Sequence, residues 1–492
     1  MVSYPYLLLA FCFTVSLAQP FKTVNLGNWL VTEGWMDPSR FDGITNKDLL
    51  DGTRVQLKST KLQKYLRAEN GGGTSLLGDS SIPSDWETFR LWRINDTYFN
   101  LRVLNKQFVG LETQGNKLVA VSNAAGGPET FHIIRNTDDP NRVRFQALNG
   151  LFLQAQSETS VTADYAGNAT VWEDSDPSVF IITIVGTLQG EYQITNGYGP
   201  DKAPQVLREH WNTYITSEDF KFLSSNNIDG VRIPVGWWIV HDPTPPKPFV
   251  GGSLQALDNA FTWAEQYGMK VIVDLHAAQG SQNGNEHSAT RDGFQEWGDS
   301  YTPDTVAVID FLAARYANRK GFTAIALLNE PMAPGITLDT LTKYYQAGYE
   351  AVRKYTQTAY VILSNRLGPA DPTELLSFAS TLNRVVIDVH YYNLFWDGFT
   401  KMTAQQNIDF IYNSRSNDLR KVTIENGPLS YVGEWTAEWY VQGASTEDYQ
   451  NFAKAQLEVF GRATFGWAYW AYRCVVPHWS LRWNIENNII HL

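Results

Sequence analysis

Apolar positions after about residue 186, together with one run near the N-terminus, follow a repeating order of strands and helices. Eight short apolar runs are typical of buried parallel strands: 22–26, 228–234, 270–275, 322–328, 360–364, 384–389, 430–433 and 463–468. Segments with helical spacing lie between most of them, and one of these places four apolar residues on one face: Leu254, Leu257, Phe261 and Ala264. Because strands and helices alternate, the pattern predicts an α/β fold class and a closed (β/α)8 TIM barrel.

Residues 51–185 follow a different pattern, in which short β-type runs are broken by glycine, asparagine, aspartate and serine. A weak repeat with a period near 43 residues starts at Lys64, Gln107 and Leu151. Each copy closes on a phenylalanine, at Phe89, Phe131 and Phe180. Three copies of about four strands each predict an all-β β-trefoil, since three units close a barrel that one unit cannot close. This segment resembles a fascin-like domain.

The predicted β-trefoil interrupts the barrel after its first strand. The expected organisation is a signal peptide at 1–18, the barrel start at 19–50, the inserted trefoil at 51–185 and the remainder of the barrel at 186–492. A surface loop accepts an insertion whose two ends lie close together. After the insertion, the chain is expected to enter a helix near residue 204. The trefoil itself could make a second carbohydrate contact, make a protein contact or act as a spacer.

The N-terminus predicts export. Tyr6 to Leu17 is an apolar run too short to span a bilayer, and a small-x-small site ends at Ala18. We therefore expect a signal peptide that is cut after Ala18, and a protein that is secreted to the extracellular space or cell wall. Sequons at Asn95 and Asn168 are then candidate glycosylation sites. No later stretch predicts a transmembrane helix.

Composition narrows the class of partner. The net charge of −12 argues against nucleic acid or an anionic membrane surface as a partner, while a neutral ligand is compatible with it. The 17 Trp, 24 Tyr and 25 Phe suit a protein that packs aromatic faces against sugars. The same counts also fit a large aromatic core, so composition alone leaves both interpretations open.

Two glutamates follow separate predicted strands, Glu330 in "AIALLNEPMAPG" and Glu434 in "LSYVGEWTAEW". The carboxyl ends of barrel strands meet at one rim, where active sites of this fold lie. Two carboxylates there are what hydrolysis of a glycosidic bond requires, because one gives a proton to the leaving oxygen and the other attacks carbon or activates water. The pair therefore predicts a glycoside hydrolase.

Other polar and aromatic residues stand at the same predicted rim: Arg232, His276, Asn329, His390, Tyr392 and Trp470. Each alone is compatible with a structural role, but packing alone does not explain so many at one rim. Asp274 and His276 lie close in sequence. We expect their side chains to point to opposite faces of the strand, which disfavours a His–Asp metal pair.

A specific family resemblance joins these residues. "NLGNWLVTEGW", "VRIPVGWW", "LHAAQGSQNG", "LLNEP", "HYY", "GEW", "WAYWAYR" and "HWSLRW" occur in order along the chain. In these motifs the chain resembles glycoside hydrolase family 5, and within it the exo-β-1,3-glucanase (glucan 1,3-β-glucosidase) branch. The stretch "QGSQNGNEHSATRDGFQEWGD" and the inserted trefoil resemble the plant subgroup of that branch.

The resemblance implies a role for each matching residue. Glu330 matches the acid/base and Glu434 the nucleophile, which Arg232 and Tyr392 would hydrogen-bond. Asn329 matches the donor to the sugar 2-OH. Four further residues match groups that bind the substrate: His276 and His390 beside the −1 sugar, Trp470 as the platform under it, and Glu33 at the non-reducing end. No metal or organic cofactor is implied.

The implied reaction is release of glucose from the non-reducing end of β-1,3-glucans or oligosaccharides by double displacement, with the carboxyl groups about 5 Å apart. One alternative is a β-glucosidase or transglucosidase acting on oligosaccharides or aryl glucosides. Another is a non-catalytic carbohydrate-binding protein with the same fold. Candidate walls of the site are Trp237, Trp238, Trp297, Phe395 and Trp396, and the polar segment 279–299 is expected to shape the entrance.

Overall fold

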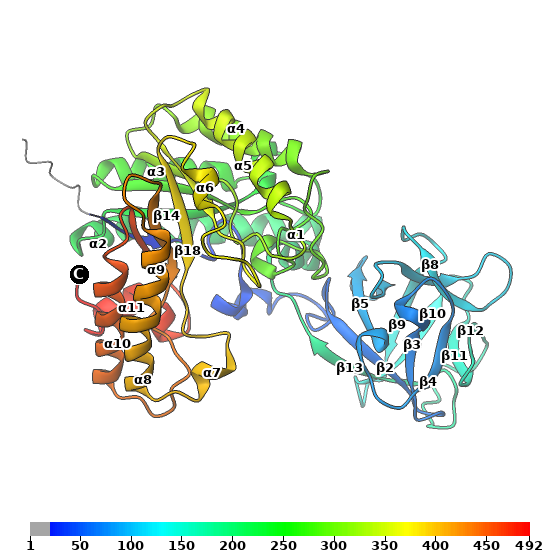
Figure 1. Cartoon of the computed structure of the whole chain (residues 1–492). Coiled ribbons are helices and arrows are strands. Elements are labelled where there is room, and N and C mark those ends of the chain that lie inside the picture. The colour runs from blue at the N-terminus through cyan, green and yellow to red at the C-terminus, as the bar shows by residue number, and fades with distance from the viewer. Residues whose placement is uncertain (1–19) are drawn as a thin grey trace, which may run out of the picture.

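Eight parallel strands close into a barrel in the computed structural model, which describes residues 20–492 (Figure 1). The strands are β1 (Phe21–Asn25), β14 (Gly230–Gly236), β15 (Lys270–Ala277), β16 (Phe322–Ala326), β17 (Tyr360–Ser364), β18 (Val385–His390), β19 (Leu429–Trp435) and β20 (Gly466–Tyr469). They pair in this order, and β20 returns to β1. All eight predicted strands and the predicted barrel are confirmed.

The inside of the barrel is apolar at one end and polar at the carboxyl ends of the strands, as β15 illustrates. Ile272, Ala324, Ile362 and Val386 belong to one buried apolar cluster contributed by adjacent strands. Asp274 and then His276 follow Ile272 at two-residue intervals, so all three side chains share one face of β15. The apolar half therefore supports a polar half at the carboxyl ends of the strands.

Helices surround the barrel: α1 (Glu191–Thr213), α2 (Ser217–Ser225), α3 (Ser253–Gln266), α4 (Thr302–Tyr316), α5 (Leu338–Arg353), α6 (Leu376–Ala379), α7 (Asp397–Thr400), α8 (Ala404–Phe410), α9 (Ser416–Val422), α10 (Thr446–Phe460) and α11 (Leu481–Glu486). The predicted helix at 253–267 is confirmed as α3, whose Leu257, Phe261 and Ala264 are fully buried. Short 3₁₀ turns lie at Gly34–Met36, Pro38–Phe41, Glu69–Gly71, Asp85–Glu87, Trp237–His241, Glu286–Ser288 and Pro477–Trp479, and a π turn at Ile411–Arg415.

The helix that follows the insertion begins earlier than expected. It starts at Glu191, not near residue 204, and Gly199 interrupts it with a positive φ of 73°. Pro200 follows directly, so the sequence "NGYGP" looks like a turn between elements. In the structure this turn is a kink that joins two helical segments, because glycine reaches the left-handed conformation at little steric cost.

Twelve antiparallel strands form the all-β region: β2 (Arg54–Ser59), β3 (Tyr65–Ala68), β4 (Leu76–Ser80), β5 (Thr88–Arg93), β6 (Tyr98–Arg102), β7 (Phe108–Leu111), β8 (Leu118–Ser122), β9 (Thr130–Arg135), β10 (Arg142–Ala147), β11 (Phe152–Ser157), β12 (Ser160–Tyr165) and β13 (Phe180–Gly186). Six of them close a ring in the order β2, β5, β6, β9, β10 and β13. Three hairpins, β3–β4, β7–β8 and β11–β12, complete three equal repeats. This pairing confirms the β-trefoil.

The three repeat-closing phenylalanines, Phe89, Phe131 and Phe180, are fully buried in the trefoil's own hydrophobic cluster. Figure 1 shows the trefoil beside the barrel, with two chain segments passing between them. Both sequon asparagines, Asn95 and Asn168, are exposed on the trefoil, and their glycosylation stays a prediction. The predicted signal peptide lies outside the described residues. Among residues 20–492, no helix is both long and apolar enough to cross a bilayer.

Candidate active site

Most of the residues predicted for the rim line one cavity of about 980 Å³, whereas Arg232 and Asn329 lie behind its lining. Its lining comprises Glu33, Trp35, Leu188, His276, Asn285, Glu286, His287, Glu330, Met332, Leu367, Gly368, His390, Tyr392, Leu394, Phe395, Arg415, Glu434, Tyr440, Trp470 and Trp479. His276 and His390 come from the ends of β15 and β18, Glu434 from β19, and Glu330 from the loop after β16. The carboxyl ends of the strands therefore bring both glutamates together, although about a hundred residues separate them.

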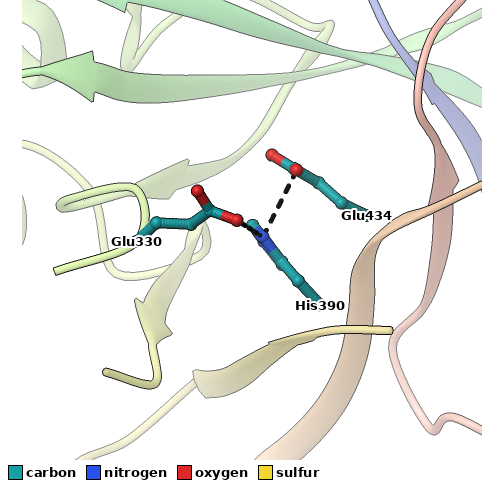
Figure 2. A group of neighbouring side chains, drawn as sticks. All are labelled: Glu330, His390 and Glu434. Carbon is teal, nitrogen blue, oxygen red and sulfur yellow. Dashed lines mark hydrogen bonds and ion pairs between the residues drawn. The ribbon is translucent and has the colours of Figure 1, made fainter. Parts of the chain in front are cut away.

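His390 stands between the two glutamates (Figure 2). Its Nδ1 lies 2.6 Å from Oε1 of Glu330 and 3.3 Å from Oε2 of Glu434. One oxygen of each carboxyl group and a ring nitrogen of His390 all lie within 4.8 Å of one another. Double displacement places its two carboxyl groups at about 5 Å, whereas inverting enzymes leave roughly 6.5–9.5 Å for a water. The spacing therefore fits double displacement.

Glu434 receives two donors that favour its ionised form. Arg232 Nη1 lies 3.1 Å from Oε1, and the Tyr392 hydroxyl donates to Oε2 at 2.8 Å. Arg232 is fully buried and is itself held by Asn25 Oδ1 at 2.8 Å and Asp274 Oδ1 at 3.1 Å. A guanidinium fixed in this way presents its donors in one orientation only.

Burial and repulsion nevertheless give the two carboxyl groups different acidities. Burial raises the pKa of Glu434 to about 7, against the attraction of His390 and with added repulsion from Glu330. Burial also acts on Glu330, but hydrogen bonds from His287 and His390 hold its pKa well below the usual range. Burial lowers the pKa of His390, yet attraction by Glu434 and Asp388 raises it well above its ordinary value.

The roles of acid/base and nucleophile require a protonated Glu330 beside an ionised Glu434 in the first step, and these shifts differ from that arrangement. In the free site, the lowered pKa of Glu330 and the raised pKa of His390 favour a protonated imidazole beside an ionised carboxylate across their 2.6 Å contact. Because one short hydrogen bond joins the two groups, the proton can pass from Nδ1 to Oε1 without any change in the total charge of the site. The proton that a general acid needs is thus present, but in a shared position.

Two predicted ligand-binding residues carry polar atoms without a protein partner. Asn329 accepts a hydrogen bond from Arg232 Nη2 at 2.7 Å, and its buried Nδ2 has no partner among residues 20–492. Glu33 accepts from Trp35 Nε1 at 3.0 Å, and within the described chain its buried Oε1 is unpaired. Burial raises the pKa of Glu33 to about 8. Glu33 lines the cavity and Asn329 directly precedes the lining residue Glu330, so these unpaired polar atoms are suited to ligand hydroxyls.

The expected orientation of Asp274 relative to His276 was wrong. Residues two apart on a strand share a face, and Asp274 Oδ2 lies 2.7 Å from His276 Nδ1. The contact leaves Nε2 of His276 for a ligand, and burial lowers the pKa of this imidazole to about 4. The ring stacks on Trp470 at 5.3 Å. Glu330, His390 and Glu434 are also of a type that binds metal ions, so a metal-free site remains a prediction.

Only one of the five candidate wall residues lines the cavity, namely the exposed Phe395. Trp238 and Trp297 are buried in packing, Trp237 lines smaller neighbouring cavities, and Trp396 is exposed away from the lining. Sequence reasoning missed the aromatic lining residues Trp35, Tyr440 and Trp479. A tryptophan or tyrosine in a loop cannot be told from a packing residue by sequence, because the sequence does not show which loops converge on the cavity.

The most important missed residue is His287. Its Nε2 lies 3.2 Å from Glu330 Oε2, and attraction by Glu330, against burial, raises its pKa to about 9. The segment 279–299 was expected to shape the entrance, and Asn285, Glu286 and His287 do line the cavity. The only signal for His287 was its place in that segment, because its approach to Glu330 depends on the course of the loop.

Known proteins match both parts of the chain. The family described as Cellulase (glycosyl hydrolase family 5) matches residues 196–473, and a domain of unknown function (DUF7910) matches residues 46–185. A probable glucan 1,3-beta-glucosidase A from Emericella nidulans is 32% identical over 342 residues, which cover 61% of this chain and 82% of that relative. A glucan 1,3-beta-glucosidase from Blumeria graminis is 32% identical over 343 residues, covering 60% and 78%.

Solved structures share the fold. A rutinosidase from Aspergillus niger superposes with a TM-score of 0.53 at 19% identity, covering 61% of this chain and 88% of that one. A second structure, of AoRut, gives a TM-score of 0.52 at 20% identity with the same coverage. The barrel, the paired carboxyl groups at its rim and the family match agree. The chain therefore belongs to glycosyl hydrolase family 5 and is a glycoside hydrolase.

Proposed function

We propose that this protein is a retaining glycosidase that releases glucose from the non-reducing ends of β-1,3-glucans or their oligosaccharides. The observation that carries the proposal is the placement of two buried carboxyl groups, with oxygens within 4.8 Å, in one cavity. The relatives named as glucan 1,3-beta-glucosidases support the β-1,3-glucan substrate.

In the first step, a carboxylate oxygen of Glu434 attacks the anomeric carbon while the glycosidic C–O bond breaks. Glu330 gives a proton to the departing oxygen, and a covalent glycosyl ester with Glu434 forms. The shared hydrogen bond with His390 supplies the proton to Glu330, and Arg232 with Tyr392 favours the ionised form of Glu434. Substrate that shields Glu434 from His390 would shift the proton further toward Glu330.

In the second step, Glu330 takes a proton from water as its oxygen attacks the anomeric carbon. The ester C–O bond breaks, glucose leaves with its original β configuration, and Glu434 returns as a carboxylate. Conversion of Glu434 to a neutral ester removes a nearby negative charge, which lowers the pKa of Glu330 at the moment when a base is needed. His287 assists the same change because its positive charge favours ionised Glu330.

Asn329 and Trp470 fit supporting roles at the reacting sugar. The free Nδ2 of Asn329 can donate to the 2-OH, a bond that strengthens as positive charge develops at the ring. His276 supports Trp470 by stacking and keeps Nε2 for a hydroxyl. These contacts act on a neutral sugar, which agrees with the acidic net charge of the chain.

Exo action requires a cavity that is closed beyond the non-reducing end of the substrate. Three segments that converge near Glu33 are suited to close it. The backbone of Glu33 bridges to Gly190, where the chain leaves the trefoil. The next residue back, Gln189, donates its N–H to Glu286 Oε2 at 2.9 Å. Glu33 and Glu286 both line the cavity, so these contacts join two barrel loops into one wall. The unpaired Oε1 of Glu33 then suits the terminal hydroxyls of a glucan chain.

A second candidate function is a β-glucosidase or transglucosidase on oligosaccharides or aryl glucosides. The aromatic lining residues Trp35, Phe395, Tyr440 and Trp479 favour it, because a flat apolar aglycone could pack on them. Both functions use the same two glutamates. We also infer secretion, with glycans at Asn95 and Asn168, on the strength of the N-terminal sequence and the two exposed sequons.

Digestion of laminaripentaose and of its reduced alditol distinguishes these functions. Exo action predicts glucose as the first product from both, with the alditol retained in the shortening fragment. Release of the reducing-end residue or of laminaribiose would contradict exo action from the non-reducing end. Much faster turnover of an aryl glucoside than of either oligosaccharide, with transfer products, would favour the second function.

A further inference from the structure

The trefoil contacts the barrel through one face of β5 and β6. Arg90 and Trp92 are two residues apart on β5, so their side chains point to the same face of the strand. Arg102, on β6, pairs in register with Arg90. Arg102 Nη1 and Trp92 Nε1 each donate to Asp292 Oδ2 at 2.6 Å. Arg90 Nη1 donates to the carbonyl oxygen of Asp292 at 2.5 Å. One barrel residue thus accepts from three trefoil side chains.

Neighbours of Asp292 add to this contact. Arg291 lies 3.7 Å from the ring centre of Trp92 and donates to the fully buried Asp51 at 2.8 Å. The Phe294 ring lies 4.1 Å from the guanidinium of Arg90. Arg102 Nη2 also reaches Glu296 Oε1 at 2.9 Å. Residues 291–296 are therefore held as a continuous stretch against the trefoil.

Because the contact with Asp292 is buried, its loss is energetically costly. The side chain of Asp292 is 3% exposed and that of Arg102 is 10% exposed. A buried carboxylate that loses its ionic partner is strongly unfavourable, so the loop would move to bring Asp292 to water. The trefoil thereby fixes the position of the barrel segment that carries Asp292.

That segment is the loop of residues 278–297, which follows β15 and is here named the His287 loop. Its inner part lies against the candidate acid/base. Asn283 Nδ2 donates to the carbonyl oxygen of Glu330 at 3.1 Å, and Gln282 Nε2 donates to that of Asn329 at 2.8 Å. His287 contacts the Glu330 carboxylate at 3.2 Å, only five residues before Asp292.

The segment that leaves the trefoil holds the same loop from a second side. Gln189 donates its N–H to Glu286 Oε2, next to His287. Gln193, at the start of α1, donates to the carbonyl oxygens of Thr290 and Arg291, each at 2.9 Å. The trefoil and the segment that leaves it thus both hold the outer part of the His287 loop.

We propose that the β-trefoil is a positioning domain, whose β5–β6 face and exit segment hold the His287 loop so that His287 and Asn283 contact Glu330. Arg102 and Trp92 are then positioning residues that act through the loop. The inference deepens the proposed function and rests on it for the role of Glu330.

His287 makes the proposed coupling measurable through pH. The charged groups near it are Glu330, Glu33, Glu434 and Glu286, and the neutral ring of His276 lies 5.3 Å away. A displaced loop withdraws a positive charge from the Glu330–His390 pair, so the pair retains the proton that it shares to higher pH. The basic limb of the profile of kcat/KM against pH should therefore move upward.

The test compares Arg102→Met, His287→Asn and the double variant. We expect R102M to lower kcat/KM for an aryl β-glucoside about tenfold, mainly through kcat, and to move the basic limb in the same direction as H287N. Because both changes act through one contact, the double variant should lose little more than H287N. Arg67→Met, which breaks an Arg–Asp pair in the β3–β4 hairpin, is the matched control and should retain the wild-type profile.

A second measurement is independent of activity. Amide hydrogen exchange across 278–297 should be about tenfold faster in R102M than in R67M or wild type. If R102M does not fold, Trp92→Phe removes one donor to Asp292 and is measured in its place. Unchanged exchange, or an additive double variant with an unmoved pH profile, would overturn the positioning role. A wild-type protein without glycosidase activity would overturn the proposed function alone, since loop exchange still tests the trefoil contact.

Discussion

The barrel and the trefoil are both built from repeated units, but they break their symmetry in different places. Barrel strands share an apolar interior and differ at their carboxyl ends, where Glu330, His390 and Glu434 meet. The trefoil repeats share buried phenylalanines and differ on the surface. Counted from those phenylalanines, Arg90 and Trp92 correspond to His132 and Ile134 and to Ile181 and Thr183.

Only the first trefoil repeat therefore carries the residues that bind Asp292. Each domain thus keeps its repeated core for stability and places its specific contacts where the repeats diverge. In the barrel those contacts surround a cavity, and in the trefoil they face the loop beside that cavity.

Glu434→Gly should remove the chemistry of the barrel and leave both folds intact. Loss of an attacking group lowers kcat by about 10⁴-fold or more. Azide should then restore turnover of an activated aryl glucoside and give the α-glucosyl azide, because the anion attacks from the side that the carboxylate vacated. Product identification by NMR checks the result, and wild-type turnover in the variant would refute the assignment of Glu434.

Phe131→Ala should do the opposite: it should lower the stability of the trefoil and leave the chemistry of the barrel in place. Truncation of a fully buried phenylalanine costs about 3–5 kcal/mol through lost burial and the cavity left behind. Thermal unfolding followed by calorimetry should show a destabilised transition. Activity at low temperature should persist as long as the β5–β6 face stays folded. An unchanged transition would argue against a shared trefoil core.

Asn329→Ala should lower kcat for a β-glucoside by about a hundredfold, since it removes a donor used mainly in the transition state. The test uses the matching 2-deoxyglucoside as a control substrate. If Asn329 Nδ2 serves the 2-OH, wild type and variant should cleave the deoxy substrate at similar rates. An equal loss on both substrates would assign Asn329 to the support of Arg232 instead.

Among the changes at the active site, His287→Asn should have the smallest effect on rate and the clearest effect on pH. Below its pKa of about 9, His287 is positively charged and favours ionised Glu330. Without that charge the Glu330–His390 pair retains its shared proton to higher pH, so the basic limb of the profile should move upward by about one pH unit. The exposed His241, changed to asparagine, is the control. A downward or absent shift in H287N would contradict the contact.

The sequence was sufficient for the parts of the fold that local patterns determine. Buried parallel strands read as short apolar runs, and all eight were found; the trefoil repeat was visible through its phenylalanines. The kink at Gly199 was missed because a local turn signal does not show whether a helix resumes. The Asp274–His276 contact was missed through a wrong assignment of strand faces.

The residues of the candidate site also fall into a group that local sequence patterns predict and a group that they do not. Residues at strand ends, such as Glu434 and His390, could be predicted because the barrel brings every strand end to one rim. His287, Trp35 and Trp479 lie on loops, so their places depend on contacts that no local pattern encodes. For His287 those contacts include a second domain, through Asp292 and Arg102.

Under the proposed function, Glu330 and Glu434 act together in double displacement. Proton NMR of the first minutes of laminaritriose hydrolysis tests it most directly, because the anomeric signals of newly released glucose appear before mutarotation. The account predicts that β-glucose accumulates first and that the α-anomer follows slowly. Initial release of α-glucose would show inversion and would contradict the roles assigned to both glutamates.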